Sequence, residues 1–125
     1  MILIRHVLIS LALAFGVAAT GGMAAAVVPL FSIEIDSEPP YYLPKAAVVL
    51  SSSVPIRWEN TTSTTHTITH ESCDAGTRCL FDSGSVRPGE RYELPGLPPG
   101  DYPYFCRVHP IMRGILSVKT PETPS

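Results

Sequence analysis

The sequence has little charge, and it lacks the features of a nucleic-acid-binding protein. Only 16% of its 125 residues are charged and the formal net charge is −2, which excludes binding to nucleic acid through a basic field. No helical periodicity follows the N-terminal segment, and there are no internal repeats. Since 45% of the residues are hydrophobic, the chain is too apolar to be disordered.

Cysteine is also scarce, and the length of the chain limits the fold. Three Cys is an odd number, which in an exported protein indicates one disulfide and one thiol with another role. About 99 residues follow Ala26, too few for a TIM barrel or a full Rossmann domain but enough for one small core. Thirteen Pro and nine Gly interrupt long helices, so the composition favours short strands and tight turns.

The N-terminus has the pattern of an export signal. Arg5 and His6 form a positive start, residues 7–19 are apolar, and the three Ala at 24–26 offer a cleavage site. An uncleaved membrane anchor is the competing interpretation, because residues 7–30 contain no charge and are nearly long enough to span a bilayer.

Both interpretations of the N-terminus place the rest of the chain outside the cytoplasm. The expected location is the periplasm or another extracytoplasmic space, where disulfides persist. The sequence thus divides into a signal or anchor at 1–26, one domain at 27–119 and a polar tail at 120–125.

The sequence of the domain predicts an all-β fold. Alternating apolar and polar residues, β-branched residues and Pro- or Gly-containing turns predict seven or so short strands, which favour a sandwich of two sheets. Pro55 pushes its strand towards a sheet edge, and residues 36–45 are expected to be a loop. The expected strands are 31–35, 46–50, 54–58, 61–69, 91–94, 101–106 and 115–119.

One short segment carries the chemistry. Cys106, His109 and Met112 place a thiolate, an imidazole and a thioether on one tight loop between two strands. Two His, one Cys and a weakly bound Met are the ligands of a blue-copper electron-transfer centre, so a second His is required. His66 and His70 are the candidates. They lie about 13 Å apart along an extended strand, so both cannot bind one ion.

The order of these residues resembles the cupredoxins, and within them the amicyanin and plastocyanin group. The resemblance covers residues 48–118, and the spacing from Trp58 to His66 favours His66 over His70 as the second ligand. The shared pattern is Trp58-x-Asn60, His66, Pro88-Gly89-Glu90 and Gly100-x-Tyr102-x-Tyr104-x-Cys106-x-x-His109-Pro110-x-Met112-x-Gly114.

The resemblance implies an eight-stranded Greek-key β-sandwich with one type 1 copper ion at one end. The implied metal ligands are His66, Cys106, His109 and Met112. The sequence departs from the family beside the first ligand, because Thr65 and Thr67 stand where many members have Pro and Asn. That Asn ordinarily ties the two ligand loops together. The insert at residues 71–78 is not an amicyanin feature either.

The two remaining cysteines allow two interpretations. Cys73 and Cys79 enclose five residues, and a disulfide between them would restrict the unfolded chain by roughly 2 kcal/mol in the loop-entropy model. The rival is a zinc site formed by Cys73, Cys79, Cys106 and His109. It requires reduced thiols in an oxidising compartment and leaves His66 and Met112 unused, so we favour the disulfide.

The function expected from these residues is that of an exported, monomeric one-electron carrier that is not an enzyme. The chain has no His-x-His pair for additional copper and no second Cys in the ligand loop. The alternative is a copper storage or delivery protein without an electron-transfer role. Redox proteins are the expected partners, docking near His109, Pro110 and Ile111, and the membrane is a partner only if the N-terminal segment is retained.

Overall fold

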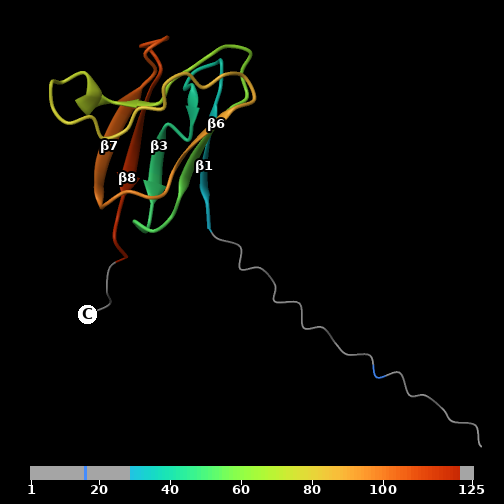
Figure 1. The fold of residues 1–125 in the computed structure, drawn as a ribbon, viewed down its shortest axis with the longest axis vertical. Coiled ribbons are helices and arrows are strands. Elements are labelled where there is room, and N and C mark those ends of the chain that lie inside the picture. The colour runs from blue at the N-terminus through green and yellow to red at the C-terminus, as the bar shows by residue number, and fades with distance from the viewer. Residues whose placement is uncertain (1–15, 17–28, 122–125) are drawn as a thin grey trace, which may run out of the picture.

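The structure, a computed structural model, describes Gly16 and residues 29–121 as two β-sheets packed face to face (Figure 1). Apart from Gly16, the expected signal at 1–26 lies outside the described residues, as do residues 122–125 of the expected tail. No helix within the described part of the chain is long and apolar enough to cross a membrane.

Each sheet has four strands. The first has the order β2-β1-β4-β6, with β1 parallel to β4; its strands are β1 Phe31–Ile35, β2 Tyr42–Leu43, β4 Ile56–Asn60 and β6 Arg91–Leu94. The second has the order β3-β8-β7-β5, with β3 parallel to β8; its strands are β3 Ala46–Val49, β5 Thr69–His70, β7 Gly100–Phe105 and β8 Arg113–Val118. A single-turn 3-10 helix, η1 (Glu71–Cys73), follows β5. This is the all-β sandwich of about eight strands that the sequence predicts.

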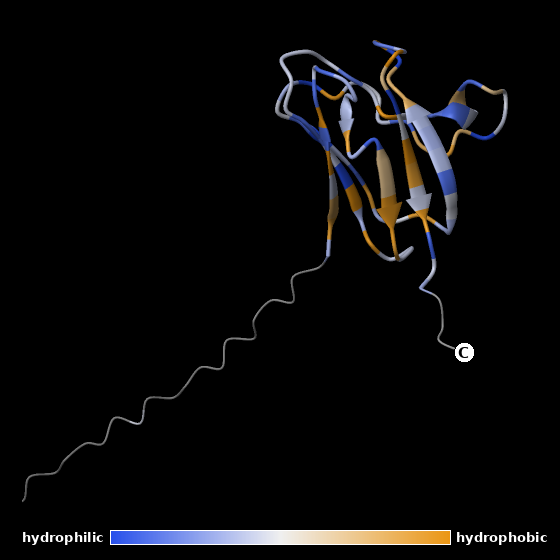
Figure 2. Cartoon of the chain, turned by 180° about the vertical axis from the view of Figure 1, so that it is seen from behind, coloured by the Kyte–Doolittle hydropathy of each residue, from blue (hydrophilic) through white to orange (hydrophobic). Residues whose placement is uncertain are grey.

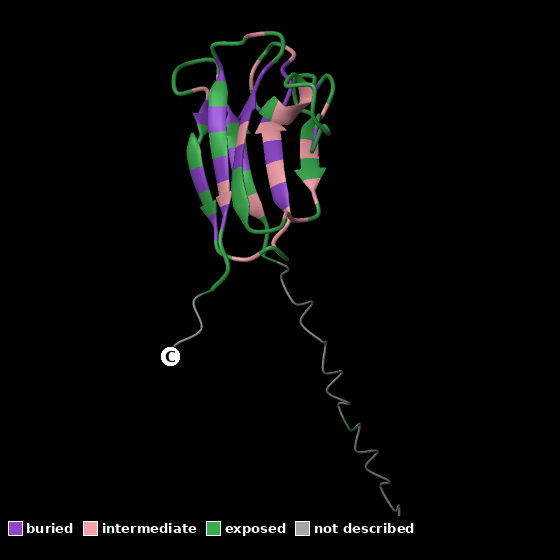
Figure 3. Ribbon diagram, turned by 90° about the vertical axis from the view of Figure 1, so that its left-hand side faces the viewer, coloured by how far each residue is buried: buried purple, intermediate pink, exposed green. Residues whose placement is uncertain are grey.

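The core lies between the sheets because buried and exposed side chains alternate along the strands. Figure 3 shows this alternation, and Figure 2 shows hydrophobic residues recurring along the same strands. Three aromatic residues form the centre of the core: the ring of Tyr104 meets that of Trp58 edge-on at 5.6 Å and that of Tyr42 edge-on at 4.8 Å. All three side chains are fully buried, so they fix the distance between the two sheets.

The expectation that Pro55 marks an edge strand is wrong. The strand begins one residue later, at Ile56, and lies inside the first sheet between β1 and β6. Pro55 precedes it, and the carbonyl of Pro55 accepts a hydrogen bond from the N–H of Phe31 at 2.9 Å. The missing N–H of proline therefore removes no hydrogen bond from the sheet.

The expected strand at 61–69 is also mostly absent. Only Thr69 belongs to a strand, and residues 61–65 form a loop in which the Thr62 hydroxyl and the Asn60 side chain bond the backbone. Such local bonds compete with strand pairing. The loop lies at one end of the sandwich, together with residues 106–112, and the start of β1 and the end of β8 lie at the other end (Figure 1).

Candidate metal centre

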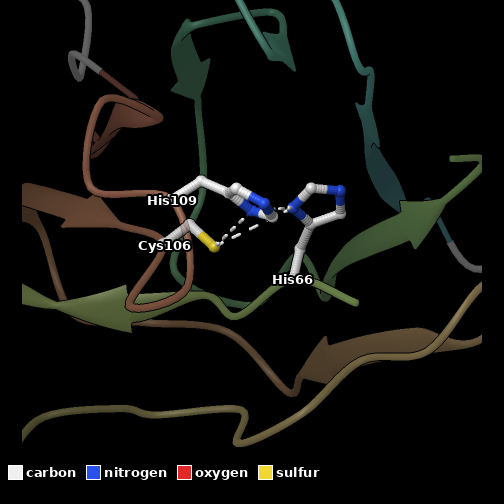
Figure 4. A group of neighbouring side chains, drawn as sticks. All are labelled: His66, Cys106 and His109. Carbon is white, nitrogen blue, oxygen red and sulfur yellow. Dashed lines mark hydrogen bonds between the residues drawn. The ribbon is translucent and has the colours of Figure 1, made fainter. Parts of the chain in front are cut away.

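Three of the predicted ligands meet at this end of the sandwich (Figure 4). The Nδ1 atoms of His66 and His109 are 3.2 Å apart, and each lies 3.9 Å from the Sγ of Cys106. A triangle with these sides has a centre about 2.1 Å from each atom. First-row ions such as zinc bind imidazole nitrogen at about 2.0–2.1 Å and thiolate sulfur at about 2.3 Å. The arrangement therefore fits one metal ion of this size.

The loop that carries Cys106 and His109 is closed by its own backbone. Cys106 follows β7, and its N–H donates to the carbonyl of Met112 at 3.1 Å, while the N–H of Met112 donates to the carbonyl of His109 at 2.8 Å. Arg113 then begins β8, which pairs with β7 in antiparallel register. Two paired strands thus hold both ends of the loop, so the spacing of the ligands follows from the fold.

Met112, the fourth predicted ligand, lies beside the other three. Its side chain is 2% exposed and lines a cavity of about 240 Å³ that His66 and His109 also line. One thiolate, two imidazoles and a thioether are soft or borderline donors, which suit a transition metal such as copper better than magnesium or calcium.

Thr67 ties the two ligand-bearing segments together. Its N–H donates to the Sγ of Cys106 at 3.3 Å. Its hydroxyl accepts from the N–H of Arg107 at 2.8 Å. Thr67 therefore connects the two ligand loops, as the resemblance expects of an Asn at this position. The side chain of Thr is shorter than that of Asn, but its hydroxyl still reaches the N–H of Arg107.

His66 is held as a buried, neutral imidazole. Its backbone exchanges two hydrogen bonds with Val86, at 3.0 and 2.8 Å, and the residue is 3% exposed. Burial lowers the pKa of His66, and the nearby His109 lowers that pKa further. A neutral ring with a lone pair on Nδ1 is the form that binds a metal.

His70 lies apart from this group. Its Nδ1 accepts from the N–H of Ser72 at 3.0 Å and lies 2.7 Å from the Ser72 hydroxyl, while the ring packs against Phe81 and Tyr102. Burial lowers the pKa of His70 as well. The structure therefore brings His66, and not His70, to Cys106 and His109.

Comparison with known proteins agrees with this architecture. The sequence matches no protein-family model and no curated protein. Among solved structures, a purple cupredoxin from Nitrosopumilus maritimus superposes with a TM-score of 0.61 at 25% identity, over 71% of this chain and 99% of that one. Two single-residue mutants of amicyanin, one in the Cu(I) form and one in the oxidised state, each superpose with a TM-score of 0.61 at 21% identity, over 72% of this chain and 82% of theirs.

The fold is that of a cupredoxin. The resemblance read from the sequence is confirmed at this level. The cupredoxin sandwich accounts for the position of the candidate ligands, because it brings the loop before β5 and the loop between β7 and β8 to the same end (Figure 1).

The chain also has a loop closed by a disulfide beside the ligand loop; it is called the stapled loop below. Cys73 and Cys79 form a disulfide with an S–S distance of 2.06 Å, and Cys106 is a free, buried thiol. The rival zinc site of three Cys and one His is therefore wrong, because two of its thiolates are joined to each other. The disulfide joins residues 73 and 79 and so closes most of the insert at residues 71–78 into a loop.

Ion pairs join the stapled loop and the residues around it to the ligand loop and the start of β8, and the sequence did not predict them. Arg107 pairs with Asp74 at 2.6 Å and with Asp82 at 3.3 Å, and Arg113 pairs with Glu71 at 3.1 Å. Each Arg belongs to a segment far along the chain from its acidic partners, so spacing gives no signal for these contacts. They tie the insert to Arg107 and Arg113, which lie on either side of the remaining ligand-loop residues.

Proposed function

We propose that this chain is an extracytoplasmic type 1 copper protein that carries single electrons between redox partners. The observation that carries the proposal is the triangle of His66 Nδ1, His109 Nδ1 and Cys106 Sγ, with Met112 beside it. When bound, copper would accept and release one electron by alternating between Cu(II) and Cu(I).

The chain's own residues suit such a role because they keep the donors in place. Cys106 is fully buried, its sulfur accepts a backbone N–H, and both ends of its loop continue into paired strands. A site held in this way reorganises little when the charge of the metal changes. The Thr67 N–H also withdraws negative charge from the Cys106 sulfur.

Partner docking is proposed at the surface around His109. Val108 and Ile111 are large hydrophobic residues that are 53% and 75% exposed, and Pro110 between them is also exposed. His109 itself is half-buried. We expect a small, weak contact with redox proteins here, as is typical of transient electron-transfer encounters, and a monomeric carrier without nucleic-acid partners.

The proposed location is the periplasm or an equivalent space. The Cys73–Cys79 disulfide supports it, because disulfides persist where thiols are not kept reduced. The N-terminal segment remains a predicted signal or anchor, and contact with a membrane follows only from the anchor.

The function is tested by adding Cu(II) to the purified protein. We expect an intense blue absorption band from thiolate-to-copper charge transfer, and a one-electron couple that cycles reversibly in voltammetry. A protein that binds copper without the band contradicts a type 1 site. A couple that cannot be cycled, with rapid release of copper to a chelator, contradicts the carrier and favours storage or delivery.

Replacement of Met112 is expected to shift the reduction potential while leaving copper bound. Met112→Gln introduces a harder oxygen donor that favours Cu(II), so the potential falls; Met112→Leu removes the donor at similar volume, so the potential rises. A tenfold change in the relative affinity for the two oxidation states corresponds to about 59 mV, and we expect shifts of at least this size in cyclic voltammetry. Equal potentials in all three proteins would show that Met112 only packs.

A further inference from the structure

The outer nitrogen of His66 faces two threonine hydroxyls. While Nδ1 points towards Cys106 and His109, Nε2 lies 2.8 Å from the Oγ1 of Thr62 and 2.9 Å from the Oγ1 of Thr64. Thr62 in turn lies against the side chain of Asn60, with Oγ1 and Oδ1 2.7 Å apart. Asn60 is 1% exposed, so the side chain that Thr62 contacts is buried inside the protein.

The orientation of the Asn60 amide is fixed by its neighbours. Nδ2 donates to the carbonyl of Thr64 at 2.8 Å and to the carbonyl of Val86 at 2.9 Å. Both carbonyls only accept hydrogen bonds, so the nitrogen must face them and the oxygen must face Thr62. The N–H of Thr62 also donates to this oxygen, at 3.0 Å.

The single hydroxyl hydrogen of Thr62 is therefore assigned. The Thr62 hydroxyl oxygen lies 2.7 Å from Asn60 Oδ1 and 3.0 Å from the carbonyl oxygen of Thr64, and both of these oxygens only accept hydrogen bonds. The hydroxyl hydrogen therefore points to them, mainly to the closer Asn60 oxygen, and is not available to His66. Thr62 Oγ1 can then only accept from His66 across their 2.8 Å contact. Nε2 consequently bears the hydrogen, and Nδ1 presents its lone pair to the metal position.

We propose that Asn60 and Thr62 are positioning residues that fix the tautomer and the ring orientation of His66 for metal binding. Thr62 hydrogen-bonds both Asn60 and the ring, whereas the exposed Thr64 makes no contact with the Asn60 oxygen and shares the Nε2–H as a second acceptor. The inference rests on the proposed function for the identity of the metal, but the tautomer belongs to the metal-free protein.

The comparison of Thr62→Val with Thr64→Val tests the proposal. Nitrogen-15 NMR of the metal-free protein at about pH 8, above the ordinary imidazole pKa of about 6.5, reports which nitrogen of His66 bears the hydrogen. The wild type is expected to show Nε2–H alone. Thr62→Val is expected to show mixed tautomers or a broadened ring signal and to bind Zn(II) roughly tenfold more weakly, since outer hydrogen-bond partners of metal ligands contribute about 10- to 100-fold in affinity.

Two control variants distinguish a loss of His66 positioning from a general loss of structure around the site. Thr62→Ser keeps the hydroxyl and is expected to restore the tautomer and the zinc affinity, and Thr64→Val is expected to change both far less than Thr62→Val. If Thr62→Val does not fold, Thr62→Ala removes the same hydroxyl with a smaller side chain.

A wild-type His66 with its hydrogen on Nδ1 overturns the proposal, as does a folded variant without the Thr62 hydroxyl that keeps a pure tautomer and wild-type zinc affinity. Because neither measurement uses copper, a failure of the blue-copper function would be recognised separately, by the missing charge-transfer band.

Discussion

Cys106→Ser is expected to remove the intense visible absorption of the copper-loaded protein completely. The band needs a thiolate that shares electron density with the metal, and a hydroxyl is a harder, less covalent donor. The site is well suited to this test, because Ser is close to Cys in size, the position is fully buried, and the Thr67 N–H has an acceptor in either case. Absorption spectra during Cu(II) titration measure the effect.

Histidine variants provide the controls for Cys106. His66→Ala and His109→Ala should each weaken copper binding or open a coordination position. His70→Ala should leave the spectrum unchanged, because the His70 ring contacts Phe81 and Tyr102 rather than the ligand group. An intense band in Cys106→Ser would refute its role, and loss of the band in His70→Ala with its retention in His66→Ala would mean that the wrong His was chosen.

Gly114→Ala is expected to lower the free energy of unfolding by about 1–3 kcal/mol, the cost of forcing extra volume into a packed core. A Cβ at Gly114 would lie 2.4 Å from the Cζ of Tyr104 and 2.5 Å from its hydroxyl oxygen. The ring cannot move away easily, because Trp58 and Tyr42 hold its other sides. Denaturant unfolding of the metal-free protein measures the loss.

Ile115→Ala is the matched control for Gly114→Ala. It lies next along β8, on the outer face, and is 37% exposed, so its truncation should cost less than the insertion at Gly114. Wild-type stability in Gly114→Ala would mean that Tyr104 repacks freely, and the three aromatic residues would then not fix the distance between the sheets.

Sequence patterns predicted the strands best where apolar and polar residues alternate, so that one face is less exposed than the other. Phe31–Ile35 and Arg91–Leu94 have the predicted bounds for this reason. The strand predicted at residues 61–69 was mostly wrong. β-branched residues favour strands in general, but here the Asn60 side chain bonds the backbone of Thr62 and Thr64 and stabilises a loop instead. The two-residue strand β2 was missed because it lies within a Pro-rich segment and exists only through its pairing with β1.

The candidate site was largely predictable because three of its residues lie on one loop. Cys106, His109 and Met112 are set by local spacing, and only His66 had to be found from another segment. The hydroxyl of Thr62 was not recognised, although an Asn followed two residues later by Thr is a local signal for such a bond. The Arg107 ion pairs depend on how distant loops pack, which spacing does not encode.

The two ends of the described chain have a practical consequence for attaching the protein to a surface. Pro29 comes two residues before β1 and Pro121 three residues after β8. β1 starts and β8 ends at the end of the sandwich away from the loop that carries His109 (Figure 1). A linker placed next to either residue and bonded to a gold electrode would orient the His109 face towards the solution. Soluble partners would then reach that face unobstructed, and the immobilised domain could serve as a sensor element that reports their binding as a current.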